Sequence, residues 1–180
     1  MGITIAAITV LLLIANFSFA QTPEYKTEVF GIVGGAAIHD DETYLGSGLN
    51  LGGGVGFRLS RRFGLNVEAY YNNSSRNFPD ARLESNATTL AADLHIYFPI
   101  RKVEPYVLVG TGLTRFHQSG NFIDADFEST DSGYTLQWGG GARIFVTRQL
   151  SVGPEFKWVS SSGISFANQL RGTVSIGYHW

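Results

Sequence analysis

The sequence predicts an all-β fold: an eight-stranded antiparallel up-and-down transmembrane β-barrel preceded by a cleaved signal peptide. Three observations predict it. Apolar residues recur at every second position over segments of about ten residues, as spanning strands require. Short and long connections alternate strictly between these segments. Mean hydropathy is only +0.04 although aromatic residues reach 13%, which is expected when apolar side chains occupy one face of each strand.

The first 20 residues are predicted to be the signal peptide. Residues 3–14 form an apolar run that is too short for a spanning helix, which needs about 20 apolar residues. Ser18 and Ala20 are small residues at the two positions that a signal peptidase reads, so we expect cleavage after Ala20. A buried N-terminal helix is the alternative, but no later segment offers a partner helix. The domains expected are therefore residues 1–20, the signal peptide, and residues 21–180, the barrel.

The first four strands follow in order. Residues 27–38 give the first, which is glycine-rich and the least regular. The second, third and fourth strands, at residues 49–59, 63–72 and 89–98, each have one apolar face and one small or polar face. The side chains expected to face lipid are Leu49, Leu51, Val55, Phe57, Leu59, Phe63, Leu65, Val67, Ala69, Tyr71, Leu90, Ala92, Leu94, Ile96 and Phe98.

The last four strands lie at residues 105–116, 134–146, 150–158 and 171–180. The pattern leaves open which parity of residues 105–116 faces lipid. The final strand is the most regular, and it places Val174, Ile176, Tyr178 and Trp180 on one face. Aromatic rings at strand ends anchor barrels at the membrane–water interfaces. The expected anchors are Trp138, Trp158, Tyr178 and Trp180.

The connections predict the orientation in the membrane. Residues 60–62, 99–104 and 147–149 are short turns, which bacterial barrels place in the periplasm. Residues 39–46, 73–85, 117–130 and 160–167 are expected to form four long extracellular loops. Nine acidic residues lie in or beside the long connections, whereas the short turns carry five Lys or Arg residues and Glu104 alone. We expect solvated acidic loops outside and basic turns near the head groups of the periplasmic leaflet.

Ionisable residues on the inward face are the first candidate site. An eight-stranded barrel is only wide enough for side chains to fill it, so buried charges must pair across the lumen. Such a luminal charge network either fills the interior or gates a narrow pore. The expected members are Arg58, Glu68, Asp93, His95, Arg143, Glu155 and Lys157.

Three segments together carry a resemblance: Pro-Tyr-Val-Leu-Val-Gly-Thr-Gly at 105–112, Trp-Gly-Gly-Gly-Ala-Arg at 138–143 and Leu-Ser-Val-Gly-Pro-Glu-Phe-Lys-Trp at 150–158. They resemble the small OmpA/OmpX-like outer-membrane barrels over essentially the whole mature chain. The resemblance implies the bacterial cell outer membrane as location. Outer-membrane lipids, lipopolysaccharide, the outer-membrane assembly machinery and an extracellular ligand of unknown identity would then be its partners. The barrel domain alone is expected, without the peptidoglycan-binding domain of larger members.

Composition and spacing exclude several classes. A net charge of −2 with 16% charged residues argues against nucleic-acid binding. The absence of Cys removes disulfides and thiolate sites. The glycine runs at 52–56 and 139–141 lack the Lys-Ser/Thr ending of a phosphate-binding loop. No cluster has metal-ligand spacing, so we expect no metal and no cofactor. A soluble lipocalin-type barrel is the alternative fold, but the polar faces carry few charges and no helical segment is apparent.

Three functions remain open at this stage. The first is a monomeric structural or surface-interaction protein that acts through its loops. The second, a narrow passive channel, would use the luminal charges. The third, a lipid A-modifying hydrolase, rests on His117 and Ser119, with Glu128 or Asp131 to orient the histidine. This pair is faintly similar to the His-x-Ser pair of outer-membrane lipid A deacylases, but Gly120 stands where Asn would follow. We therefore expect no catalytic residues.

Overall fold

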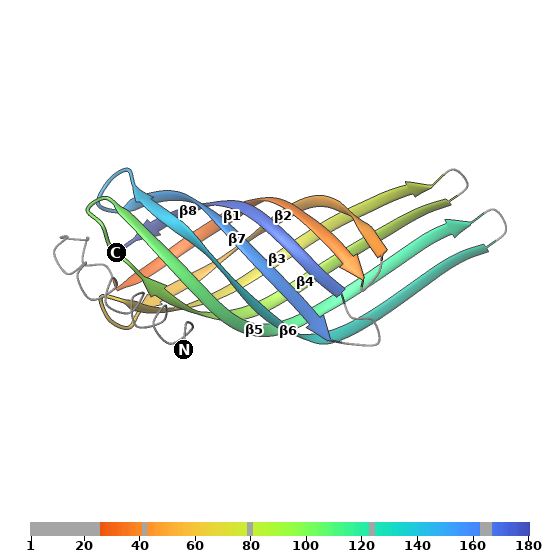
Figure 1. Ribbon diagram of the computed structural model, residues 1–180, viewed down its shortest axis with the longest axis horizontal. Coiled ribbons are helices and arrows are strands. Elements are labelled where there is room, and N and C mark those ends of the chain that lie inside the picture. The colour runs from red at the N-terminus through yellow and green to blue at the C-terminus, as the bar shows by residue number, and fades with distance from the viewer. Residues whose placement is uncertain (1–25, 41–42, 79–80, 123–124, 163–166) are drawn as a thin grey trace, which may run out of the picture.

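The computed structural model describes residues 26–40, 43–78, 81–122, 125–162 and 167–180, which form one closed barrel of eight antiparallel strands (Figure 1). Each strand pairs with the next, and β8 pairs with β1 to close the barrel. The predicted fold class is confirmed, whereas the predicted signal peptide lies outside the described residues. The strands are β1 (Thr27–Asp40), β2 (Thr43–Arg58), β3 (Phe63–Phe78), β4 (Ala81–Tyr97), β5 (Val103–Phe122), β6 (Ala125–Phe145), β7 (Leu150–Ser162) and β8 (Ala167–His179).

The inward and outward faces follow the alternation read from the sequence. In β7 every second residue from Ser151 to Ser161 is buried in the lumen. The apolar residues predicted to face lipid lie on the outside of β2, β3, β4, β6, β7 and β8. The structure also decides the parity of β5, because Val107 and Val109 are about half exposed whereas Tyr106 and Leu108 are buried. Within the described residues, no helix is both long enough and apolar enough to cross a membrane.

The prediction of four long loops is wrong over most of their length. Strand pairing between β3 and β4 continues to Phe78 and Ala81, and pairing between β5 and β6 continues to Phe122 and Ala125. Of the other two predicted loops, residues 39–40, 43–46, 160–162 and 167 are also strand. The alternation of apolar and polar residues ends where both faces of a strand meet water, but backbone pairing does not depend on that alternation.

The two longest hairpins form one sheet. β4 and β5 pair along their whole upper parts, as far as Ala81 and Phe122. The hairpins β3–β4 and β5–β6 are therefore adjacent halves of a four-stranded sheet, which extends beyond the rest of the barrel at the right of Figure 1. We call this end the hairpin end, and the opposite end, with the three short turns and Trp180, the turn end.

The outward face of this sheet changes from apolar to polar along the strands. Leu90, Leu113 and Tyr134 are cross-strand neighbours that expose 57%, 57% and 75% of their surface. Two residues nearer the hairpin end, the neighbours across β4 and β5 are Thr88 and Arg115. The apolar band of the barrel therefore ends between these two positions, and the sheet beyond it lies outside the membrane.

Candidate functional site

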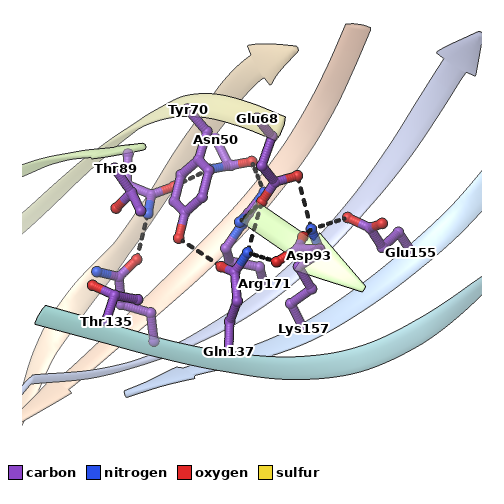
Figure 2. Close-up of polar contacts among 12 residues, drawn as sticks. Asn50, Glu68, Tyr70, Thr89, Asp93, Thr135, Gln137, Glu155, Lys157 and Arg171 are labelled. Carbon is purple, nitrogen blue, oxygen red and sulfur yellow. Dashed lines mark hydrogen bonds and ion pairs between the residues drawn. The ribbon is translucent and has the colours of Figure 1, made fainter. Parts of the chain in front are cut away.

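Inward side chains from several strands meet in the middle of the lumen, and we call Glu68, Asp93, Glu155, Lys157 and Arg171 the central cluster. Lys157 is 1% exposed and lies at its centre. The Nζ atom of Lys157 is 2.8 Å from Glu68 Oε2, 2.8 Å from Asp93 Oδ2 and 3.2 Å from Glu155 Oε1. One ammonium group thus connects β3, β4 and β7 (Figure 2).

Arg171 of β8 is the second cation of the central cluster. Its Nη1 atom is 3.3 Å from Glu68 Oε1, and its guanidinium carbon lies 3.5 Å from the centre of the Tyr70 ring. Gln137 Nε2 donates to Glu68 Oε1 at 3.2 Å and also to Asp93, while the Tyr70 hydroxyl donates to Gln137 Oε1 at 3.3 Å (Figure 2). Gln137 thus donates to Asp93 Oδ1, whereas Lys157 contacts the other oxygen of that carboxylate.

A chain of hydroxyl groups links four adjacent strands beside the central cluster. Thr89 Oγ1 is 2.7 Å from Thr114 Oγ1, which also contacts Thr135 Oγ1, and Thr135 Oγ1 is 3.1 Å from Ser161 Oγ. All four side chains are buried, and they come from β4, β5, β6 and β7. Together with the central cluster they link strands on opposite sides of the barrel.

A second set of charges lies nearer the turn end, and we call Glu28, Arg58, Glu104 and Arg143 the turn-end cluster. Arg58 donates to both carboxylate oxygens of Glu104. Arg143 pairs with Glu28, and its Nη1 atom is 3.6 Å from Glu104 Oε2. The guanidinium carbons of Arg58 and Arg143 also lie 3.9 Å and 4.6 Å from the centre of the Tyr97 ring.

Tyr106 and Glu155 connect the two clusters. The Tyr106 hydroxyl donates to Glu155 Oε2 at 2.9 Å, while the other oxygen of Glu155 faces Lys157. A cavity of about 10 Å³, room for one water molecule, lies here between Glu28, Asn66, Tyr106, Arg143 and Glu155, among others. At this cavity the lumen between the clusters has room for about one water molecule, and side chains fill the space around it.

Two glycines make room for these side chains. A Cβ atom at Gly110 of β5 would collide with the carboxylate of Asp93 on β4. A Cβ atom at Gly141 of β6 would lie 2.6 Å from the Tyr106 hydroxyl oxygen. Glycine at these positions therefore allows a bulky polar residue on the neighbouring strand to reach into the narrow lumen.

The structure divides the single network that the sequence suggested. It brings Glu68, Asp93, Glu155 and Lys157 together, but it places Arg58 and Arg143 in the turn-end cluster. His95 is buried near both but forms no ion pair among the described residues; its ring stacks on Tyr106 with centroids 4.8 Å apart.

Sequence reasoning missed three charged members. Glu104 was assigned to a short turn, yet it is fully buried in β5, because the strand begins two residues before Pro105. Glu28 lies in the irregular first strand, and Arg171 begins the regular part of the last one. Extending the inward parity of Thr173 by two residues would have turned Arg171 inward, whereas the open parity of residues 105–116 gave no such signal for Glu104.

The four predicted anchors all lie on the outside of the barrel, with exposed fractions between 38% and 57%. Trp138 and Trp158 are cross-strand neighbours with ring centroids 6.5 Å apart, and Tyr178 and Trp180 are 6.0 Å apart at the turn end. Trp158 lies eight residues beyond Leu150 in β7, which at the usual rise and tilt is about 20 Å along the barrel axis. The two aromatic pairs thus lie near opposite edges of the apolar band.

His117 and Ser119 lie in strand β5 rather than in a loop. His117 Nδ1 is 3.1 Å from Thr130 Oγ1, and its Nε2 atom is 3.6 Å from Glu128 Oε1. The side chains of His117 and Glu128 are 40% and 75% exposed. Among the described residues, no group of three or more His, Cys, Asp or Glu side chains is arranged to bind a metal ion.

Comparisons with known proteins agree with this architecture. The family model described as "Outer membrane protein beta-barrel domain" matches residues 5–179. Neisserial surface protein A has 12% identity and a TM-score of 0.67, covering 86% of this chain and 97% of its own. Ail, the attachment invasion locus protein of Yersinia pestis, has 14% identity and a TM-score of 0.56, and the match covers 87% of this chain and 99% of Ail. OprG of Pseudomonas aeruginosa has 12% identity and a TM-score of 0.54, and the match covers 90% of this chain and 99% of OprG. No curated protein matches the sequence.

Proposed function

Because the chain belongs to the outer membrane protein β-barrel domain family and lies in the bacterial outer membrane, we propose that it is a surface-interaction protein. The barrel serves as the anchor, and the sheet of β3 to β6 is presented to an extracellular polypeptide. One observation carries the proposal. β6 pairs with β5 from Ala125 onward, whereas among the described residues its pairing with β7 begins only at Tyr134.

The β6 edge, residues 125–133, is a template for strand addition. Beyond the end of β7, Figure 1 shows the described strand β6 at the margin of the projecting sheet. An open edge offers backbone N–H and C=O groups to an extended segment, whose main chain supplies affinity and whose alternate side chains supply specificity. The partner that suits this edge is a polypeptide in extended conformation.

The charge of the β6 edge favours a basic partner. No Lys or Arg occurs between Arg115 and Arg143, whereas Asp124, Asp126, Glu128 and Asp131 fall in this stretch. Lys or Arg side chains on an added strand would meet Glu128 and Asp131 of the described edge, which favours association and selects against acidic segments. A second copy that paired along the same edge would instead bring like charges together.

The structural neighbours give a useful contrast. Ail is described as an attachment invasion locus protein, and it has been crystallised with the heparin analogue sucrose octasulfate. A polysulfate is an anion, and the acids of the β6 edge would repel it. Our proposal for this chain is therefore a cationic polypeptide rather than a sulfated sugar.

Binding to the protein refolded in zwitterionic nanodiscs tests the proposal. The probe is a synthetic peptide of about ten residues, the length of a barrel strand, with alternating Lys and Thr. We expect saturable binding that weakens when Glu128→Gln and Asp131→Asn are combined, and that is unchanged by Glu84→Gln within the same sheet. A peptide of equal charge with Pro in place of Thr loses every second backbone N–H group and should bind far more weakly. Equal binding of the two peptides, or stronger binding of sucrose octasulfate, would contradict the proposal.

A further inference from the structure

The three short turns share a pattern in which cations lie between two membrane-facing apolar residues. In the β2–β3 turn, Arg61 and Arg62 lie between Leu59 and Phe63. These flanking residues are 64% and 45% exposed on the outside of the barrel. The backbone N–H of Leu59 donates to the carbonyl of Phe63 at 2.9 Å, so the turn closes at the level of the apolar pair.

The other two turns repeat this arrangement. Arg101 and Lys102 lie between Ile100 and Val103, whose backbones hydrogen-bond at 2.8 Å. Arg148 lies between Val146 and Leu150, whose backbones hydrogen-bond at 2.9 Å. All four flanking residues are exposed apolar side chains, and Arg101, Lys102 and Arg148 are exposed as well.

Lys26 adds a sixth cation at the same end. It is exposed, and its backbone N–H donates to the carbonyl of Trp180 at 3.1 Å. The only acidic residue of the predicted short connections, Glu104, is turned into the lumen and paired with Arg58. We call Lys26, Arg61, Arg62, Arg101, Lys102 and Arg148 the cationic ring.

Arg101 occupies a backbone conformation that suits glycine better. Its φ angle is +54°, in the left-handed region where a side chain is unfavourable. The turn therefore carries a cation at a position where the backbone alone would favour Gly or Asn.

We propose that the cationic ring binds the anionic head groups of phospholipids in the periplasmic leaflet and gathers a shell of anionic lipid around the turn end. The flanking apolar residues lie in the acyl region, and the long Arg and Lys side chains reach from there to the phosphates. The cations are distributed over all three turns and the start of β1, as an annulus of lipid requires. A single protein partner would contact one side of the barrel.

Fluorescence quenching at two levels of the same barrel tests this inference. Trp180 lies at the turn end, whereas Trp138 pairs with Trp158, about 20 Å farther along the barrel axis. A Trp138→Phe and Trp158→Phe variant leaves Trp180 as the only tryptophan, whereas Trp158→Phe and Trp180→Phe leave Trp138. Each is refolded into phosphatidylcholine vesicles that contain a minor fraction of either brominated phosphatidylglycerol or brominated phosphatidylcholine.

We measure the ratio of the association of brominated anionic lipid to that of brominated zwitterionic lipid at each tryptophan. At Trp180 we expect a ratio of about five, the factor that one cation near the surface supplies. At Trp138 the ratio should be close to one. Combining Lys26→Gln with Arg148→Gln should lower the ratio at Trp180, because both cations lie near this residue. Lys26 contacts Trp180 directly, and Gln149, which follows Arg148, accepts a hydrogen bond from the His179 N–H at 2.7 Å. Arg115→Gln, at the other end, should not change it.

High salt should also reduce the preference at Trp180, which tests the wild-type charges without any change in the ring. A heat-dependent gel shift establishes that each variant is folded. A ratio near one at Trp180, equal ratios at Trp138 and Trp180, or a ratio that survives the loss of Lys26 and Arg148 would overturn the inference. Loss of the preference on adding inorganic phosphate at constant ionic strength would identify a site for free anions and would overturn it as well.

Discussion

At the scale of single residues, the structure of the lumen depends on which residue each charged side chain pairs with, and not only on the sign of its charge. The central cluster holds three carboxylates and two cations, and Lys157 contacts all three of the acids. The sequence alternation in β7 correctly turned Lys157 and Glu155 inward. It did not identify their partners, because pairing across a lumen depends on the relative height of strands that are far apart in the chain. Arg143 was thus grouped with Glu68, although it pairs with Glu28.

The first prediction concerns Lys157. Lys157→Met keeps most of the side-chain volume but leaves three carboxylates beside Arg171 alone, so we expect a loss of about 3–5 kcal/mol in the free energy of unfolding. Adding Glu68→Gln removes one negative charge and should restore part of that stability. Urea titration of the protein refolded in zwitterionic lipid vesicles, which offer the cationic ring no anionic lipid, measures both variants, with exposed Lys102→Met as the control. A double variant less stable than Lys157→Met alone would contradict the ion-pair assignment.

The second prediction concerns the lipid face. Leu94 is 40% exposed on the outside of β4, between the apolar residues Leu90 and Phe98. Leu94→Arg should therefore cost about 2–4 kcal/mol, as for a cation near the bilayer midplane. Ala91 faces the lumen and is 3% exposed, so Ala91→Ser should cost little. Folding titrations into vesicles compare the two, and an unchanged stability of Leu94→Arg would mean that this face does not meet lipid.

At the scale of strands, the sequence predicts the segments that have one face toward lipid and the other toward the lumen. It does not predict the remaining strand segments. Residues 150–158 alternate because one face meets lipid and the other a packed lumen. In β5, the buried Tyr106 and Leu108 pack with Tyr97, so apolar residues occur at both parities and the alternation is lost. Beyond Arg115 both faces of the sheet meet water, and no pattern distinguished strand from loop.

The third prediction concerns the terminal strand. The Trp180 carbonyl accepts from the backbone N–H groups of Lys26 and Thr27 at 3.1 Å and 3.2 Å, and the Trp180 N–H donates to Thr27 at 3.0 Å. Deleting Trp180 should remove these closing bonds, about 1 kcal/mol each, together with an interfacial ring. We expect less barrel in the outer membrane and more protease-sensitive protein in the periplasm.

Replacing both Tyr178 and Trp180 with Ala keeps the backbone bonds and isolates the contribution of the rings. Phe63→Ala, which removes an aromatic ring at the same end but outside β8, is the matched control. Membrane fractionation and protease sensitivity measure all three. If the deletion and the double Ala variant insert as well as wild type, the terminal strand has no special part in assembly.

At the scale of the whole molecule, the barrel separates three environments. Its apolar band meets lipid, its hairpin end carries an acidic sheet edge, and its turn end carries the cationic ring. Between the two ends, the central and turn-end clusters link strands across the lumen. We interpret this charged interior as a plug that stiffens the anchor of the projecting sheet, which is the structural alternative to a gate.

The fourth prediction separates a plug from a gate. A plug closes the lumen by volume, so the wild type should not conduct in planar bilayers. Combining Glu68→Gln, Asp93→Asn and Lys157→Met removes three of the five charges of the central cluster but keeps the volume, and it should remain closed. Truncation by Lys157→Ala with Arg171→Ala removes the two largest buried side chains of the central cluster. This variant should admit ions if the barrel stays folded, which the heat-dependent gel shift reports.

A gate held by ion pairs would behave differently, because the volume-conserving variant breaks those pairs and would open the pore. Single-channel recordings on the three proteins therefore decide the point, and conductance in the wild type or in the volume-conserving variant would rule out the plug.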